Sequence, residues 1–197
     1  MRIGLTGGIG SGKSTVAAAL VEFGGMRLID TDAIARALTL PGGAAMPAIA
    51  AQFGPAFVAA DGALDRAAMR ELAFRDPAAK RALEAILHPL IGAETARQAA
   101  LAAPGQALLF DVPLLVESGR WRALVDRVLV VDCREDTQVE RVMVRSHLSE
   151  GAVRAIVAQQ ASRTQRRAAA DAVLYNDGIT LPQLRDEVRR LLASPLF

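Results

Sequence analysis

The sequence predicts an α/β protein in which a parallel sheet is flanked by helices and interrupted by a helical insertion. A short apolar segment at 2–6 leads through a glycine-rich segment into a helix at about 13–23, and a second apolar segment follows at 26–30. This strand–loop–helix–strand order is typical of a parallel sheet covered by helices. Further strand-like segments follow at 107–111, 127–132 and 172–175. About 75 residues separate the second strand from the third, many more than a crossover helix needs.

The long interval predicts an inserted helical subdomain at about 33–104. Turn residues divide it, with Pro-Gly-Gly at 41–43 and Asp-Gly at 61–62. Asp and Pro at 76–77 indicate a helix start, because aspartate is a preferred N-cap and proline suits the first helical position. We expect the His-Pro pair at 88–89 to interrupt the helical pattern again.

The remaining elements follow from capping signals. Two glycines at 24–25 end the first helix, as glycine does at a C-cap. Helices are expected at about 135–146 and 149–168, and the turn Asn-Asp-Gly at 176–178 ends the fifth strand. Thr180 and Gln183 have the spacing of a capping box, which opens a last amphipathic helix that runs to about residue 193.

Composition excludes several classes of protein. The net charge is only +2 and the aromatic content 4%, which argues against a general nucleic-acid binder. A single cysteine excludes an internal disulfide framework and argues against a cysteine-based zinc site. Apolar runs are too short for a membrane span, and Lys13 and Glu22 interrupt the first one, so we expect neither a signal peptide nor a membrane anchor. The expectation is a cytoplasmic protein.

The strongest motif is GGIGSGKS at 7–14, which fits G-x-x-x-x-G-K-[ST] between a predicted strand and a predicted helix. Glycines let the backbone N–H groups of such a P-loop turn toward phosphate oxygens, and the helix N-terminus adds a favourable dipole. The lysine reaches the β- and γ-phosphates and the serine hydroxyl binds Mg²⁺. Only two of the 23 basic residues are lysines, and one of them stands in this motif. The predicted nucleotide-binding residues here are Gly8, Gly10, Ser11, Gly12, Lys13, Ser14 and Thr15, with Ser14 as the metal ligand.

Aspartates follow three of the predicted strands, where ligands of α/β sheets bind. Asp30 and Asp32 would point the same way on an extended chain, and a carboxylate there could orient an acceptor hydroxyl. One or both could instead cap the next helix. Asp111 and Asp132 each end an apolar strand and resemble a Walker B aspartate, and the sequence does not choose between them.

The segment 141–167 is strongly basic, with six arginines against one acidic residue. Arginine suits bidentate contact with phosphate. In a P-loop enzyme such a segment is interpreted as a lid that closes on the triphosphate, although a solvated helical face would have the same composition. His88, in the insertion, is by itself more typical of a structural histidine than of a ligand.

Motifs along nearly the whole chain resemble one family, dephospho-coenzyme A kinase. They are LTGGIGSGKST (5–15), IDTDAIAR (29–36), LHPLI (87–91), DVPLLVE (111–117), VLVVD (128–132) and the distal QASR, AD and NDG within 160–178. The resemblance implies transfer of phosphate from ATP to the 3′-hydroxyl of dephospho-coenzyme A, with Mg²⁺ as cofactor. It also implies a P-loop NTPase fold of the nucleoside-monophosphate-kinase type. The kinase core would comprise 1–32, 105–140 and 169–197, the acceptor-binding insertion 33–104 and the lid 141–168.

The resemblance also assigns residue roles. Lys13, Asp32 and Arg141 would be catalytic: Lys13 would hold the phosphates, Asp32 would position or deprotonate the acceptor hydroxyl, and Arg141 would stabilise the transferring group. Arg36 and His88 would join Asp32 at the acceptor. The resemblance also implies that Asn176 and Gly178 lie on the adenine side. From the arginine-rich segment itself, Arg145 and Arg163 are expected as further lid contacts to phosphate.

Two other readings compete with this one. Another P-loop kinase, of a nucleoside, nucleotide or sugar, would share the P-loop and lid. A nucleotide-operated switch or regulatory binding protein is the reading from another class. A GTPase switch should carry the guanine motif N-K-x-D, which is absent because Asn176 is the only asparagine. The expected partners are ATP and dephospho-coenzyme A, without nucleic acid or membrane, and the sequence says nothing about oligomeric state.

Overall fold

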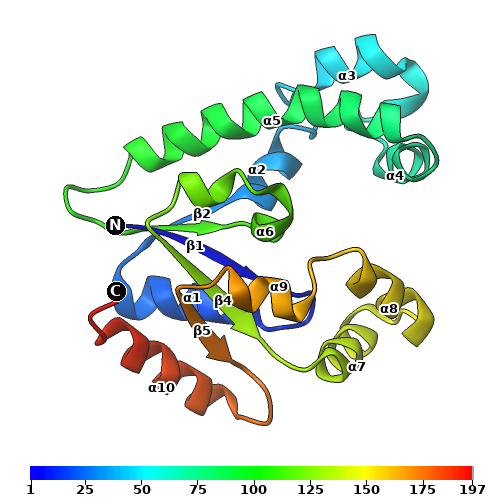
Figure 1. Ribbon diagram of the computed structural model, residues 1–197. Helices are drawn as coiled ribbons and strands as arrows, with labels where there is room; N and C mark the ends of the chain where they lie inside the picture. The colour runs from blue at the N-terminus through cyan, green and yellow to red at the C-terminus, as the bar shows by residue number, and fades with distance from the viewer. Residues whose placement is uncertain (197) are drawn as a thin grey trace. The chain divides into compact units, whose positions relative to one another are not determined.

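The computed structural model describes residues 1–196, and the chain divides into two compact units. The first comprises Met1–Ile29 and Ala102–Phe197, and the second is Asp30–Leu101. In the sequence, the second unit is therefore inserted between the two segments that form the first (Figure 1).

A five-stranded sheet forms the centre of the first unit, in the order β2-β3-β1-β4-β5. The strands are β1 (Arg2–Gly7), β2 (Arg27–Asp30), β3 (Leu108–Asp111), β4 (Arg127–Asp132) and β5 (Ala172–Tyr175). β1 pairs in parallel with both β3 and β4, and β4 pairs in parallel with β5. The predicted parallel sheet is confirmed, with β2 and β3 beginning one residue later than expected.

Helices surround this sheet. They are α1 (Lys13–Gly24), α6 (Leu115–Ser118), α7 (Glu135–Ser146), α8 (Glu150–Ala158), α9 (Arg163–Ala168) and α10 (Leu181–Leu192), with a 3₁₀ turn η2 (Trp121–Ala123). α1 and α10 lie side by side against one face of the sheet (Figure 1). Leu20 of α1 and Val188 of α10 are fully buried there with Ile3, Leu5 and Leu129 of the sheet. Burial of each such side chain contributes about 1.5–3 kcal/mol to the stability of the fold. The packing of α1 and α10 therefore stabilises the position of these strands.

The helix expected at 149–168 is two helices, and that prediction was wrong. α8 ends at Ala158 and α9 begins at Arg163. Ser162 caps α9: its hydroxyl accepts a hydrogen bond from the Gln165 amide at 3.2 Å, and the Gln165 carboxamide oxygen accepts one from the Ser162 amide at 2.8 Å. This capping box starts a new helix, since the N-cap residue itself has an extended backbone.

The second unit is helical, as the sequence predicts. It contains α2 (Thr31–Ala37), α3 (Met46–Phe53), η1 (Pro55–Phe57), α4 (Arg66–Arg75) and α5 (Pro77–Ala100). Met46, Ile49 and Met69 are buried at its centre. Asp76 caps α5 as expected, but α5 continues through Pro89, so the predicted break was wrong. Proline removes its own N–H from the helical ladder and crowds the carbonyl four residues earlier, yet the chain remains helical over all 24 residues of α5.

Among the helices of residues 1–196, none combines the length and the apolar character that crossing a membrane requires.

Candidate active site

The P-loop connects the end of β1 to the start of α1. Gly10 and Gly12 have φ values of 76° and 90°, in the left-handed region that glycine adopts without strain. The Ser11 amide donates to the Gly8 carbonyl at 3.0 Å, which closes the turn. Gly12 is the N-cap of α1 and supplies no side-chain acceptor, and the first turn of α1 has no acidic residue. The amides at the start of α1 are therefore suited to an anionic ligand.

Close packing also explains the glycines. A Cβ atom at Gly10 would lie 2.7 Å from the Gln138 carbonyl oxygen, and one at Gly8 would lie 2.8 Å from Arg166 Nη2. At Gly12, a Cβ atom would overlap the Asn176 carboxamide nitrogen. The loop is thus enclosed by α7, α9 and the segment after β5, and any larger residue would displace it.

Lys13 forms an ion pair with Asp111 at the end of β3. The side chain of Lys13 is 16% exposed and that of Asp111 is 8% exposed. β3 lies beside β1, with Asp111 in register with Leu5, so sheet order brings the carboxylate to the P-loop. Of the two strand-end aspartates that resemble a Walker B residue, Asp111 is the one that contacts the P-loop lysine.

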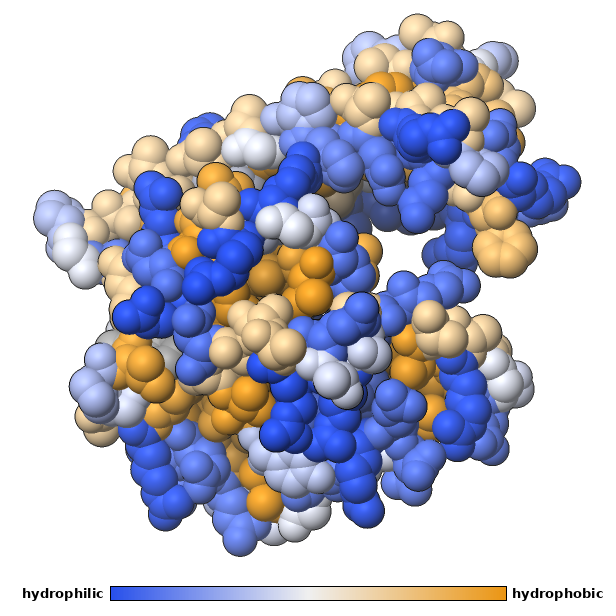
Figure 2. All heavy atoms as spheres, in the orientation of Figure 1, coloured by the Kyte–Doolittle hydropathy of each residue, from blue (hydrophilic) through white to orange (hydrophobic). Residues whose placement is uncertain are grey.

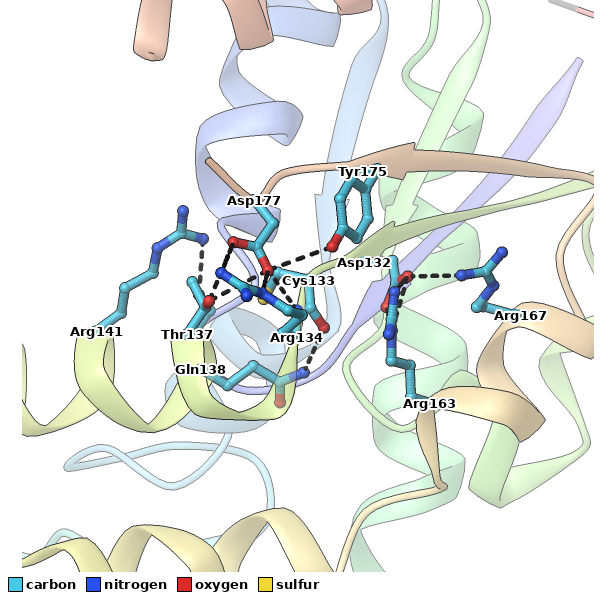
Figure 3. Close-up of polar contacts among 11 residues, drawn as sticks. Asp132, Cys133, Arg134, Thr137, Gln138, Arg141, Arg163, Arg167, Tyr175 and Asp177 are labelled. Atoms are coloured by element: carbon cyan, nitrogen blue, oxygen red, sulfur yellow. Dashed lines mark hydrogen bonds and ion pairs between the residues drawn. The ribbon is translucent and has the colours of Figure 1, made fainter. Parts of the chain in front are cut away.

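Asp132, at the end of β4, has different partners (Figure 3). Its carboxylate accepts hydrogen bonds from Arg163 Nε at 2.8 and 3.0 Å and from Arg163 Nη2 at 2.8 Å, and Arg167 Nη1 lies 3.4 Å away. The Asp132 side chain is only 1% exposed. The hydrogen bonds with Asp132 raise the pKa of Arg163, and its guanidinium also lies over the Tyr175 ring at 5.5 Å. Asp132 thus holds α9 against the end of β4, and these two arginines of α9 compensate its negative charge.

The arginines of the basic segment have separate positions. Arg141 Nη1 donates to the Gly10 carbonyl at 3.4 Å, so Arg141 lies beside the P-loop. Arg163 is held by Asp132, and Arg145 is exposed on α7. Strongly hydrophilic residues gather around α9 and β5 on the face that Figure 2 shows. The structure therefore brings one of the three predicted lid contacts, Arg141, to the phosphate-binding loop.

The loop after β5 is hydrogen-bonded to the P-loop and to residues at the start of α7. The Asn176 carboxamide nitrogen donates to the Ser11 carbonyl at 2.8 Å. The Asp177 carboxylate accepts from the Arg134 amide at 2.8 Å and Nε at 2.9 Å, and from the Thr137 hydroxyl at 3.1 Å (Figure 3). The Arg134 guanidinium and amide hold the pKa of Asp177 well below its usual range. Sequence reasoning assigned Asp177 to a turn and missed this clamp, since only tertiary structure brings α7 to the loop.

The linker between α8 and α9 also contacts the P-loop, which sequence reasoning missed. The Gln160 carboxamide oxygen accepts a hydrogen bond from the Ile9 amide at 2.9 Å. Glu117, after β3, accepts one from the Ala161 amide at 2.6 Å. The only sequence signal was that both acceptors lie in quoted family motifs.

The predicted acceptor residues lie in the second unit. Asp32 is exposed in the first turn of α2, so the prediction of an extended Asp30–Asp32 pair was wrong. Asp30 is the N-cap and accepts from the Ala33 amide at 2.8 Å, and its carboxylate lies 3.9 Å from Arg36 Nη2. His88 is exposed on α5, which packs against α2.

A divalent cation would find oxygen ligands at Ser14 and Asp111. Within residues 1–196 no group of three or more His, Cys, Asp or Glu side chains could hold a metal by itself.

A parallel sheet with β1 between β3 and β4, a P-loop at its carboxyl edge and a lysine–aspartate pair beside it define a P-loop nucleotide-binding protein. The model of the dephospho-CoA kinase family matches residues 1–181, and the chain belongs to this family. It is an ATP-dependent transferase that acts on an alcohol group.

The chain is also similar to individual proteins and solved structures. The dephospho-CoA kinase of Bordetella parapertussis is 62% identical over 191 residues, which cover 96% of this chain and 88% of that protein. The solved structure of TT1252 from Thermus thermophilus has 37% identity and a TM-score of 0.84, covering 98% of this chain and 96% of that one. The dephospho-CoA kinase from Campylobacter jejuni has 25% identity and a TM-score of 0.71, covering 98% and 95%.

Proposed function

We propose that this protein transfers the γ-phosphoryl group of ATP to the 3′-hydroxyl of the dephospho-coenzyme A ribose and so forms coenzyme A in the cytoplasm. The observation that carries the proposal is the family match over residues 1–181 together with a P-loop whose lysine and neighbouring aspartate lie at the edge of the sheet. The reaction forms a bond between the ribose O3′ and the γ-phosphorus, and the bond to the β,γ-bridging oxygen breaks with ADP as leaving group.

The first unit would bind the triphosphate. Lys13, which is paired with Asp111, would exchange this partner for β- and γ-phosphate oxygens, and the amides at the start of α1 would surround the phosphates. Ser14 and Asp111 would hold Mg²⁺ together with the nucleotide. When bound, Mg²⁺ neutralises part of the negative charge that develops in phosphoryl transfer.

Asp32 would serve the acceptor. Its carboxylate is exposed, so it is hydrated and accessible to a ligand. In the reaction it would accept the proton that the ribose 3′-hydroxyl loses as O3′ bonds to phosphorus. Arg36 and His88, exposed in the same unit, would contact the acceptor, and 33–104 would form its binding region.

The segment 141–168 would act as the lid over a core that comprises 1–32, 105–140 and 169–197. Arg141 lies beside Gly10 and would stabilise charge on the transferring group, and Arg145 and Arg163 would approach the phosphates when the lid closes. Closure would also exclude water, which otherwise competes with the ribose hydroxyl as acceptor.

The test is ATP consumption in the presence of Mg²⁺, with and without dephospho-coenzyme A, with mass measurement of the product. We expect turnover that depends on the acceptor and a product with one added phosphate. Coenzyme A is the matched control acceptor, because its 3′-position already carries phosphate. ATP consumption that is equal with and without the acceptor would refute the proposal, and a screen of nucleosides and sugars would then identify the acceptor class.

A further inference from the structure

The P-loop is held at two points by carboxamide side chains from distant parts of the chain. Asn176 donates to the Ser11 carbonyl at 2.8 Å, across 165 positions of sequence. Gln160 accepts from the Ile9 amide at 2.9 Å, across 151 positions. Neither contact uses a P-loop side chain, so both act directly on the backbone whose shape determines where the phosphate-binding amides point.

Asn176 is enclosed rather than directed at a ligand. The residue is 7% exposed, and its backbone amide donates to the Asp132 carbonyl at 2.7 Å. Its carboxamide nitrogen fills the space that the missing side chain of Gly12 leaves open. The side chain is therefore fixed between the end of β4 and the P-loop, with its donor directed at the loop backbone.

Gln160 is held in place by its neighbours. Glu117 accepts from the Ala161 amide at 2.6 Å, and Arg166 donates to the Ala161 carbonyl. Arg166 is itself 3% exposed and lies beside Gly8. Both main-chain polar groups of Ala161 are therefore hydrogen-bonded, and this holds the adjacent Gln160 in place with its side chain against the Ile9 amide.

We propose that Gln160 and Asn176 are positioning residues that keep the P-loop in its phosphate-binding conformation from two sides. In this proposal both residues act on the phosphate-binding backbone and not on the base, which for Asn176 replaces the adenine-side role that the resemblance implies. The inference rests on the proposed binding of ATP at the P-loop, but not on the identity of the acceptor. Loss of either contact leaves a main-chain group of the loop without its partner and allows the loop to sample other conformations, so phosphate binding weakens whatever is attached to the phosphates.

The test compares ATP with inorganic tripolyphosphate, which has no base. Binding of both ligands with Mg²⁺ is measured by competition against a fluorescent ATP analogue, for the wild type, Asn176→Ala and Gln160→Ala. We expect Kd to rise about tenfold for both ligands in both variants, as the loss of one hydrogen bond to an enclosed group predicts. The ratio of the two Kd values should stay at the wild-type value.

Gln159→Ala is the matched control, because Gln159 precedes Gln160 and is exposed. It should bind both ligands as the wild type does. A loss of ATP affinity without loss of tripolyphosphate affinity would overturn the proposal in favour of a base contact, and unchanged Kd values for both ligands would overturn it outright.

Stability and kinetics separate positioning from a general folding defect. Melting temperatures are measured without nucleotide, and if Asn176→Ala does not fold, Gln160→Ala on the half-buried linker carries the test alone. In turnover assays we expect KM for ATP to rise while KM for the acceptor stays unchanged, whereas an equal rise in both would contradict the proposal. The binding measurements contain no acceptor, so they remain readable even if dephospho-coenzyme A is not the substrate.

Discussion

Asp132→Asn tests the division of roles between the two strand-end aspartates. The structure gives Asp132 three hydrogen bonds from Arg163 within 3.0 Å and a weaker contact from Arg167, and it leaves 1% of the Asp132 side chain exposed. Asparagine preserves the shape of the side chain but removes its charge. The variant should therefore lose stability, because α9 is fastened to β4 through this carboxylate.

The size of the loss follows from burial. Removing one partner of a fully buried ion pair costs about 3–5 kcal/mol. Arg163 is 31% exposed and Arg167 is 54% exposed, so water can solvate both guanidinium groups, and asparagine retains one acceptor oxygen. We therefore expect a loss of about 2 kcal/mol, which for a chain of this length lowers Tm by about 4–8 °C.

Thermal unfolding without nucleotide, followed by circular dichroism, measures this loss. Asp186→Asn is the control, because its ion pair with Arg189 is exposed and should contribute less than about 1 kcal/mol. Asp111→Asn should affect activity more than stability, with turnover reduced much more than in Asp132→Asn. If Asp132→Asn melts within about 1 °C of the Asp186→Asn control, the reasoning from burial is refuted.

Three further predictions concern turnover and pH. Asp32→Ala should nearly abolish kcat while the fold survives, because the acceptor loses its proton acceptor; turnover within tenfold of the wild type would exclude that role. Arg141→Ala should lower kcat more than it lowers ATP affinity, since its contact matters most in the transition state, and a change confined to KM would contradict this. Asp177 has a lowered pKa, so its carboxylate stabilises the fold above its ordinary pKa of about 3.8 and this contribution is lost as the pH falls below that value. The Tm difference between the wild type and Asp177→Asn, measured from pH 7 downward, should shrink below about pH 4, and a constant difference would disprove the assignment.

Local signals in the sequence predicted the strands, the start of α1 and the helical insertion. Two helix boundaries were predicted wrongly. Pro89 predicted a break, but α5 remains helical on both sides of the proline. Ser162 and Gln165 have the spacing of a capping box inside the predicted helix at 149–168, and this capping box starts α9 as a helix separate from α8.

The sequence by itself determined the phosphate-binding chemistry, because the P-loop places its glycines, Lys13 and Ser14 within eight consecutive residues between a strand and a helix. Only the tertiary structure decided which aspartate meets Lys13 and what Asn176 contacts. The Lys13–Asp111 pair spans 98 positions and the Asn176–Ser11 bond spans 165. Contacts of this kind depend on strand order and on helix packing against the sheet, and neither is encoded in the local periodicity of a single sequence.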